Sequence, residues 1–218
     1  MTGKGYKGMG MEGPIAKWYA KATHKDIEEF RTLARRMDER LKPGAKVLEV
    51  APGPGYFAIE LAKLGTYNIT GLDISETFVE IARKNAREAG VEVDFRCGNA
   101  SGMPFGDNSF DLIVCRAAFK NFTDPVGALR EMRRVLKPGG RAVIIDLRKD
   151  APKEDIDAHI DNMHVGKLNS AFMKLAFRTM LLKRAYTRAD FERFIAGSGF
   201  EKFEIGEAPV GFEVTLVK

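Results

Sequence analysis

Between Val47 and Ile145 the sequence alternates short apolar runs, rich in β-branched residues, with longer stretches of helical periodicity. Such alternation is typical of parallel strands joined by crossover helices. The expected strands are Lys46–Val50, Asn68–Asp73, Glu92–Cys97, Phe110–Cys115 and Arg141–Leu147, and the expected helices are Tyr56–Leu64, Thr77–Ala89 and Pro125–Leu136. Lys137-Pro138-Gly139-Gly140 is expected to end the last helix and turn the chain. The pattern predicts an α/β fold, a doubly wound and mostly parallel sheet.

The segments on either side of this core have their own patterns. Residues 12–41 have helical spacing, whereas Phe200–Glu207 and Gly211–Val217 alternate like a pair of antiparallel strands. Asp150–Ser198 is expected to be a helical insertion, and from Lys167 to Arg188 it has no acidic residue but many interleaved basic and apolar ones. A cap helix with snorkelling lysines is the simplest interpretation. Two functional alternatives remain, an apolar lid over a substrate and contact with a membrane surface.

Composition excludes several classes of protein. With 218 residues, 44% hydrophobic and 30% charged, the chain has an ordinary globular balance, and a net charge of +5 falls short of a nucleic-acid footprint. Cys97 and Cys115 form no disulfide framework or zinc pattern, so we expect both to be buried and expect no metal site. No apolar run is long enough for a signal peptide or a membrane span, which predicts a cytoplasmic location.

A glycine-containing loop follows the first expected strand. In Ala51-Pro52-Gly53-Pro54-Gly55 the two glycines let a ligand approach main-chain N–H groups, which favours an anionic group there. Asp73 follows about 18 residues later at the end of the next strand, where a carboxylate accepts hydrogen bonds from ribose hydroxyls, unless it only caps the turn before Ser75. The loop alone also fits a dinucleotide fingerprint, so an NAD-dependent enzyme remains an alternative.

Further motifs favour a different class of enzyme with such a loop. They are Glu49-Val50-Ala51-Pro52-Gly53-Pro54-Gly55, Gly71-Leu72-Asp73-Ile74-Ser75, Gly98-Asn99-Ala100-Ser101-Gly102-Met103-Pro104-Phe105, Ser109-Phe110-Asp111-Leu112-Ile113-Val114, and the run Ala128 to Gly140. In this order they resemble the class I S-adenosylmethionine-dependent methyltransferases, especially the branch with quinone C-methyltransferases and other small-molecule enzymes. The resemblance covers about Tyr19 to Leu147. It implies a Rossmann-like, seven-stranded methyltransferase fold.

The resemblance also implies an organisation and a cofactor. Residues 1–218 would form one domain, with an N-terminal lid and helices (1–41), a cofactor-binding core (42–149), a helical cap (150–198) and a strand pair (199–218). The cofactor would be S-adenosyl-L-methionine, with its methionine carboxylate on the loop, its ribose on Asp73 and its adenine near Asn99. The implied cofactor residues are Tyr19, Glu49, Ala51, Gly53, Gly55, Asp73, Ile74, Asn99, Ala100 and Arg116.

Two of these residues depart from the family pattern. Ala51 stands where the family usually has glycine, which we expect to be tolerable only if its φ stays negative. Asn99 stands where an aspartate is usual, so its carbonyl could accept from the adenine amine without offering a charge, or it could simply be a turn residue before Gly102. In similar proteins the N-terminal segment folds over the cofactor, which suggests such a role for Tyr6 and Trp18; core packing is the alternative for Trp18.

The acceptor side has several candidate residues. A base is needed only if the acceptor arrives protonated. The candidate catalytic residues are Lys120 and Asn121 after the fourth strand and His164 in the insertion; His159, Asp161, Asn162 and Asp146 are further candidates, and turn-capping or surface roles are the alternatives. The predicted reaction is in-line methyl transfer to a small, partly hydrophobic molecule, with no nucleic-acid partner. An S-adenosylmethionine-binding sensor without turnover is the second hypothesis.

Overall fold

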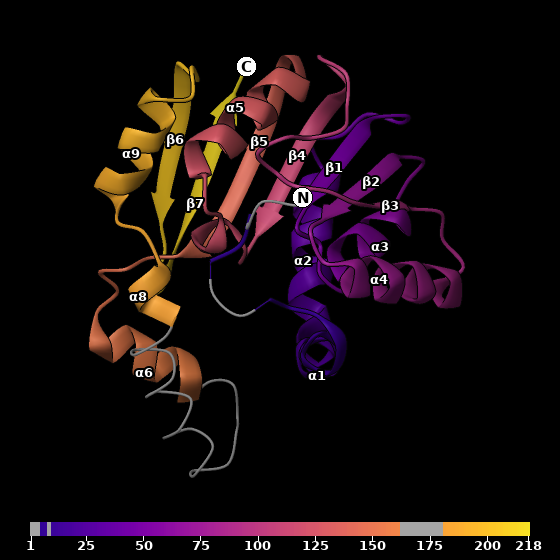
Figure 1. Cartoon of the computed structure of the whole chain (residues 1–218), viewed down its shortest axis with the longest axis horizontal. Helices are drawn as coiled ribbons and strands as arrows, with labels where there is room; N and C mark the ends of the chain where they lie inside the picture. The colour runs from indigo at the N-terminus through magenta and orange to yellow at the C-terminus, as the bar shows by residue number, and fades with distance from the viewer. Residues whose placement is uncertain (1–4, 8–9, 162–180) are drawn as a thin grey trace.

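The computed structural model describes residues 5–7, 10–161 and 181–218. Its seven-stranded sheet runs in the order β3-β2-β1-β4-β5-β7-β6 (Figure 1). The parallel strands are β1 (Lys46–Val50), β2 (Asn68–Asp73), β3 (Asp94–Cys97), β4 (Phe110–Arg116) and β5 (Leu136–Leu147), and β7 (Gly211–Val217) pairs antiparallel with both β5 and β6 (Lys202–Glu207). The predicted fold class is confirmed. A dinucleotide-binding sheet has the order 3-2-1-4-5-6, so the antiparallel β7 between β5 and β6 distinguishes this sheet from one.

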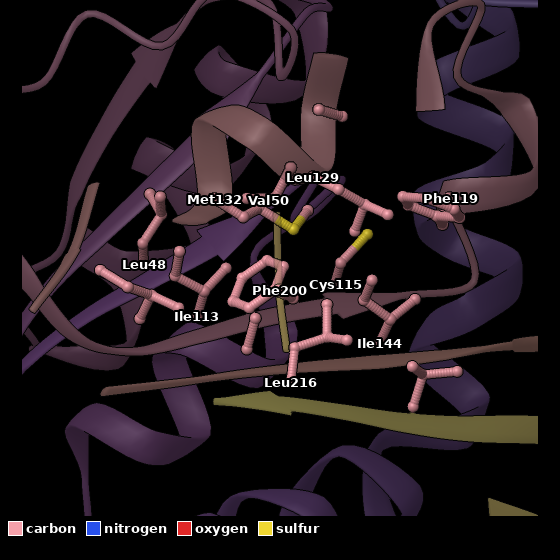
Figure 2. Packing of buried hydrophobic residues seen from close by; sticks show 14 of the residues in the cluster. Leu48, Val50, Ile113, Cys115, Phe119, Leu129, Met132, Ile144, Phe200 and Leu216 are labelled. Atoms are coloured by element: carbon pink, nitrogen blue, oxygen red, sulfur yellow. The ribbon is translucent and has the colours of Figure 1, made fainter. Parts of the chain in front are cut away.

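Helices cover both faces of the sheet because alternate strand residues point to opposite sides. The helices α2 (Ile27–Asp38), α3 (Tyr56–Ala62) and α4 (Glu76–Ala89) pack on the face that carries Val47 and Val114. On the other face, α5 (Pro125–Val135) and α9 (Arg188–Ala196) cover Leu48 and Ile113. Figure 2 shows this second layer, in which Leu129 and Met132 of α5 pack near Cys115 of β4.

The remaining helical segments lie beyond the carboxyl ends of the parallel strands. They are α1 (Gly13–Thr23), η1 (His24–Asp26), η2 (Phe119–Asn121), α6 (Lys153–Asp161) and α8 (Leu182–Arg184). Figure 1 shows α1, α6 and α8 on the side toward which β4 ends. The helix expected over residues 12–41 is therefore two helices separated by the 3₁₀ turn η1. Ligands of open α/β sheets bind at the carboxyl ends of the strands, so these elements surround the candidate site.

Some predicted boundaries are wrong. The segment Lys137-Pro138-Gly139-Gly140 was expected to be a turn but lies inside β5, which begins at Leu136. The chain end holds it there: Gly139 N donates to Lys218 O at 2.8 Å, and Lys218 N donates to Gly140 O at 3.1 Å. A sequence window around the turn residues contains no sign of this distant partner. The strands β3 and β6 each begin two residues later than expected, and α3 ends two residues earlier.

Two other expectations need qualification. Within the helical region expected over Asp150–Ser198 the structure describes α6, α8 and α9, and residues 162–180 lie outside the described residues. Most of the basic stretch from Lys167 to Arg188 is among them. Cys115 is buried as expected, but Cys97 is exposed because it ends the edge strand β3. No helix in the described ranges is long and apolar enough to cross a bilayer.

Candidate functional site

The loop between β1 and α3 reverses direction through three residues in the left-handed region. Ala51, Gly53 and Gly55 have φ angles of 57°, 54° and 80°. The expectation that Ala51 keeps a negative φ is therefore wrong. Its N–H donates to Leu72 O at 2.8 Å, which holds the start of the loop on β2 while the chain bends away. Alanine in this conformation costs roughly 1–2 kcal/mol, a strain typical of functional loops.

The two glycines of the loop serve different purposes. A Cβ atom on Gly55 would lie 2.6 Å from Phe95 Cζ and 3.0 Å from Ala82 Cβ, so this glycine lets α3 pack closely against β3 and α4. A Cβ atom on Gly53 would meet nothing within 4 Å. Gly53 is thus required for its backbone conformation alone, and it leaves open space beside the loop.

Two buried carboxylates face this loop from neighbouring strands. Glu49 Oε2 accepts from Ala58 N at 3.1 Å, and Asp73 accepts from Gly53 N and Ser75 N, each at 2.9 Å. Burial raises the pKa of Glu49 to about 8, against the lowering effect of the Ala58 bond. Burial also raises the pKa of Asp73 to about 6, although the Ser75 and Gly53 N–H groups act in the opposite direction.

Neither carboxylate has a salt-bridge partner among the residues that the structure describes. Arg116 acts on Glu49 only through its field, and Asp73 adds negative charge to the same region. Asp73 therefore carries negative charge near neutral pH without a bonded cation, and a cation nearby would favour ionisation of Glu49 as well. A ligand that brings positive charge into the loop would therefore be stabilised there.

Asn99 and Ile74 lie beneath a short N-terminal strap, residues 5–7. Tyr6 forms an antiparallel bridge with Phe122, and Lys7 N donates to Asn121 O at 2.7 Å. A Cβ atom on Gly5 would lie 2.7 Å from Ile74 Cδ1 and 2.8 Å from Asn99 Nδ2. The strap therefore covers the predicted adenine side of the site in close contact. Asn99 Oδ1 accepts from Ser101 N at 3.0 Å, which also makes Asn99 a turn residue, and Ala100 is half-buried against the core.

Tyr19 and Arg116 approach the site from α1 and β4. The Tyr19 ring meets Phe78 edge to face with centroids 5.8 Å apart, and burial raises the pKa of its phenol. The guanidinium of Arg116 pairs with Glu29 and lies 4.4 Å from the centroid of the Phe30 ring. Arg116 affects both Tyr19 and Glu49 electrostatically. The structure thus brings these predicted cofactor residues together at the ends of β1 and β4.

Lys120 and Asn121 lie in η2, directly after β4, and both are buried. Lys120 Nζ lies 2.9 Å from Asp146 Oδ1 and also donates to Ala117 O. The backbone N–H of Lys120 donates to Asp146 Oδ2 at 2.8 Å. Ala117 has a φ of 56°. The pair of Lys120 and Asp146 therefore fixes a strained loop at the carboxyl end of β4.

The predicted residues of the insertion are only partly covered. Asn162 and His164 lie outside the described residues. His159 and Asp161 belong to α6, whose Ile156 and Ile160 pack with Leu182 of α8. Asp26 of η1 lies within electrostatic range of His159, so α6 and η1 approach each other.

Sequence reasoning missed three contributors to the site: Gly5, Glu29 and Tyr186. Lys7 Nζ donates to the Tyr186 hydroxyl at 2.6 Å across 179 positions of the chain. Tyr186 in turn belongs to an aromatic cluster with Phe119 and Phe191. No local pattern identifies such partners, because they meet only after the sheet has formed.

Comparisons with known proteins agree with this geometry. Residues 48–144 match the family model described as a methyltransferase domain. The chain is 34% identical over 131 residues to the ubiquinone/menaquinone biosynthesis C-methyltransferase UbiE of Shewanella sediminis. The aligned region covers 58% of this chain and 51% of that protein. The chain spans about half the length of the curated relatives it matches.

Solved structures share the whole fold. A Methanococcus maripaludis protein classed as an S-adenosylmethionine-dependent methyltransferase superposes with a TM-score of 0.77 at 23% identity and covers 99% of this chain and 97% of its own. The cyclase SpnF superposes with a TM-score of 0.62 at 28% identity and covers 80% of this chain and 59% of its own. In its matched domain, its motifs and its sheet order, the chain is similar to the class I S-adenosylmethionine-dependent methyltransferases and has their fold.

Proposed function

We propose that this protein binds S-adenosylmethionine between β1 and β2 and transfers its methyl group to a small, lipophilic molecule. The observation that carries the proposal is the pair of buried carboxylates, Glu49 and Asp73, at the glycine loop. S-adenosylmethionine has a sulfonium and an ammonium group, and either would supply the positive charge that this region lacks. The cofactor therefore fits the site on electrostatic grounds.

Within this proposal each predicted cofactor residue has a position. The loop Ala51–Gly55 would hold the methionine end, with Tyr19 and Arg116 beside it. Asp73 would hold the ribose through oxygen lone pairs that its bonds to Gly53 and Ser75 leave available. Ile74, Asn99 and Ala100 would line the adenine side.

The bound cofactor would supply an activated methyl group on a good leaving group. The chain's task is then chiefly orientation, which is worth roughly 7–11 kcal/mol for well-placed reactants. Lys120 is better suited to this than to accepting a proton, because its ammonium is bonded to Asp146 and Ala117. We assign Lys120 to positioning the β4–η2 loop against the acceptor. Asn121 presents its backbone to the strap, through the bond from Lys7 N.

The lipophilic acceptor is supported by the relatives. UbiE is named as a C-methyltransferase of ubiquinone and menaquinone biosynthesis. Tyr186 is partly exposed beside this loop and is backed by the buried rings of Phe119 and Phe191. An acceptor with a hydrophobic ring could pack against the Tyr186 ring.

Binding without methyl transfer is the second candidate, and the fold shared with the cyclase SpnF favours keeping it. Calorimetry with S-adenosylhomocysteine and NAD tests the cofactor. We expect the former to bind and NAD not to bind. Asp73→Ala should weaken binding about 100-fold through the loss of charge-assisted hydrogen bonds, whereas Asp107→Ala, at an exposed carboxylate paired with Arg134, should not.

Turnover needs a separate experiment. The protein is incubated with labelled methyl donor and a metabolite extract, and labelled products are separated by chromatography. A labelled product that disappears with Asp73→Ala supports methyl transfer. Binding of S-adenosylhomocysteine with no product from any extract would support the second candidate, and binding of NAD in its place would refute the first.

A further inference from the structure

The only tryptophan of the chain, Trp18, lies on the outer side of α1 with 69% of its surface exposed. Core packing, considered for it on sequence grounds, is therefore excluded. Of the large apolar side chains in the described ranges, the other exposed ones, Leu64, Leu181 and Phe203, reach 40–45%. Tryptophan has a large aromatic side chain whose exposure to water is unfavourable. The exposure of Trp18 therefore needs an explanation.

The exposure does not come from a loosely held helix. Gly13 N donates to Thr77 Oγ1 at 3.0 Å at one end of α1, and near the other end Ala20 O accepts from the Tyr56 hydroxyl at 2.8 Å. Ala16 and Ala20 are buried on the inner face. The helix is thus fixed between α4 and α3, and its orientation commits Trp18 to the outside.

The outer face around Trp18 is basic. Pro14, Trp18 and Lys21 follow each other by four and three residues and so share one stripe, with Lys17 beside it. All four are exposed, and Lys25 of η1 continues the charge. Lys17 and Lys21 make no salt bridge within the part of the chain that the structure describes. We call Pro14, Lys17, Trp18 and Lys21 the outer α1 face.

We propose that the outer α1 face docks this protein on the surface of an anionic lipid bilayer. Indole rings favour the water–membrane interface, and lysines beside them are attracted to anionic headgroups. A protein partner suits this face less well, because protein interfaces are depleted of lysine and bury about 800 Å² per partner. Single-stranded nucleic acid needs a groove with successive stacking platforms, whereas this face has a single aromatic ring.

The charge of the neighbouring elements sets the orientation. The helix α6 lies beyond the same end of the strands as α1 (Figure 1) and carries Glu154 and Asp155 in its first turn. Anionic headgroups repel this first turn of α6, whereas α8 on the same side carries Lys183 and Arg184, so contact is made through α1 with α8 beside it. Tyr19, on the inner face of α1, meets Phe78 in the site. Docking would therefore place the carboxyl ends of the strands near the bilayer, and the consequence, a short path for a lipophilic acceptor, rests on the proposed function.

Because Trp18 is the only tryptophan, its fluorescence reports on this face alone. The full chain is titrated with vesicles of phosphatidylcholine with or without phosphatidylglycerol. We expect a blue shift and protection from acrylamide with the anionic vesicles, weakened by added salt. Co-sedimentation with the same vesicles gives the partition coefficient. The same method measures vesicle binding by Trp18→Ala, which has no tryptophan fluorescence and should lose binding.

Charge reversal supplies the matched comparison. Lys17→Glu/Lys21→Glu should lower partition about 30-fold or more, since each lysine near the surface contributes about 1 kcal/mol. The control Lys42→Glu/Lys202→Glu changes the net charge equally. Lys42 and Lys202 are also exposed, but they precede β1 and begin β6, at the opposite end of the strands from α1. This control should partition like the unmodified protein.

Three results would overturn the proposal: no blue shift with anionic vesicles, an equal loss in both double variants, or a blue shift caused by self-association or by an RNA oligonucleotide without vesicles. S-adenosylhomocysteine binding by each variant is measured in parallel. Failure of the unmodified protein to bind it would refute the cofactor assignment and leave the docking result standing. Normal binding by a variant that no longer partitions would confirm that the two are separate.

Discussion

The proposed cofactor half and the proposed acceptor half of the site are built in different ways. On the cofactor side, Glu49, the glycine loop and Asp73 lie within 25 positions of the sequence, and their hydrogen bonds join β1, the loop, α3 and β2. On the acceptor side, Lys120 bonds to Asp146, and Tyr186 of the neighbouring aromatic cluster accepts a hydrogen bond from Lys7. The first half is fixed by one β-α-β unit. The second exists only when distant segments meet.

The largest expected effect breaks the acceptor half. Asp146→Ala leaves the ammonium of Lys120 buried without its partner and should lower the free energy of unfolding by about 3–5 kcal/mol. Asp111→Ala breaks an ion pair with Lys137 whose side chains are 37–38% exposed, and should cost about 0–1 kcal/mol. Urea denaturation of both variants gives the two values. Equal losses would mean that the buried pair does not support the loop.

The next effect separates the two glycines of the cofactor half. Gly55→Ala combines a left-handed backbone with a Cβ that would lie 2.6 Å from Phe95 Cζ, so we expect a loss of about 2–4 kcal/mol. Gly53→Ala keeps the strain without the collision and should lose about 1–2 kcal/mol. Thermal unfolding distinguishes them. Gly53→Ala as the worse variant would contradict the packing role of Gly55.

The electrostatics of the cofactor half predicts a pH dependence. Burial raises the pKa of Glu49 from 4.5 to about 8, so between these values the folded chain binds more protons than the unfolded chain. Stability contributed by this group should therefore fall as pH rises from about 5 to 8, by an order of a few kcal/mol. Glu49→Gln should flatten this part of a stability–pH curve. An unchanged slope in that variant would exclude Glu49 as the source.

Ligand binding should show the opposite trend. A cationic ligand favours the deprotonated carboxylate, so S-adenosylmethionine should bind more tightly as pH rises toward 8, by at most about tenfold per unit. S-adenosylhomocysteine lacks the sulfonium charge and should show a weaker dependence. Calorimetry with the two ligands across this range measures the difference. Identical profiles would contradict an electronegative loop that selects the sulfonium.

The smallest effect concerns the strap. Gly5→Ala brings a methyl group against Ile74 Cδ1 and Asn99 Nδ2, both at the ends of side chains that can move aside. We expect a change in unfolding free energy below about 1 kcal/mol and a few-fold faster release of S-adenosylhomocysteine, read by stopped flow. Lys7→Met, which removes the bond to Tyr186, should act similarly. A large loss of stability in either would mean that the strap is part of the core.

The contrast also explains which residues could be found from the sequence. Periodicity and glycine spacing located β1, β2, β4 and the loop because each is specified by neighbouring residues. Lys137 to Gly140 has the composition of a turn, yet it pairs with Lys218 as part of β5. Ala51 adopts a positive φ that its side chain disfavours, since the bond to Leu72 and the packing around the loop outweigh the local preference.

The sequence by itself determined the alternating architecture, the position of the glycine loop and the acid at the end of β2, because strand burial and turn conformation follow from residues close together in the chain. Only the tertiary structure decided that Lys120 is bonded to Asp146, that residues 5–7 cover Asn99, and that Trp18 faces outward. These depend on which segments meet across the sheet. Burial, and with it the charge state of Glu49 and the exposure of Trp18, is a property of the assembled fold rather than of any stretch of residues.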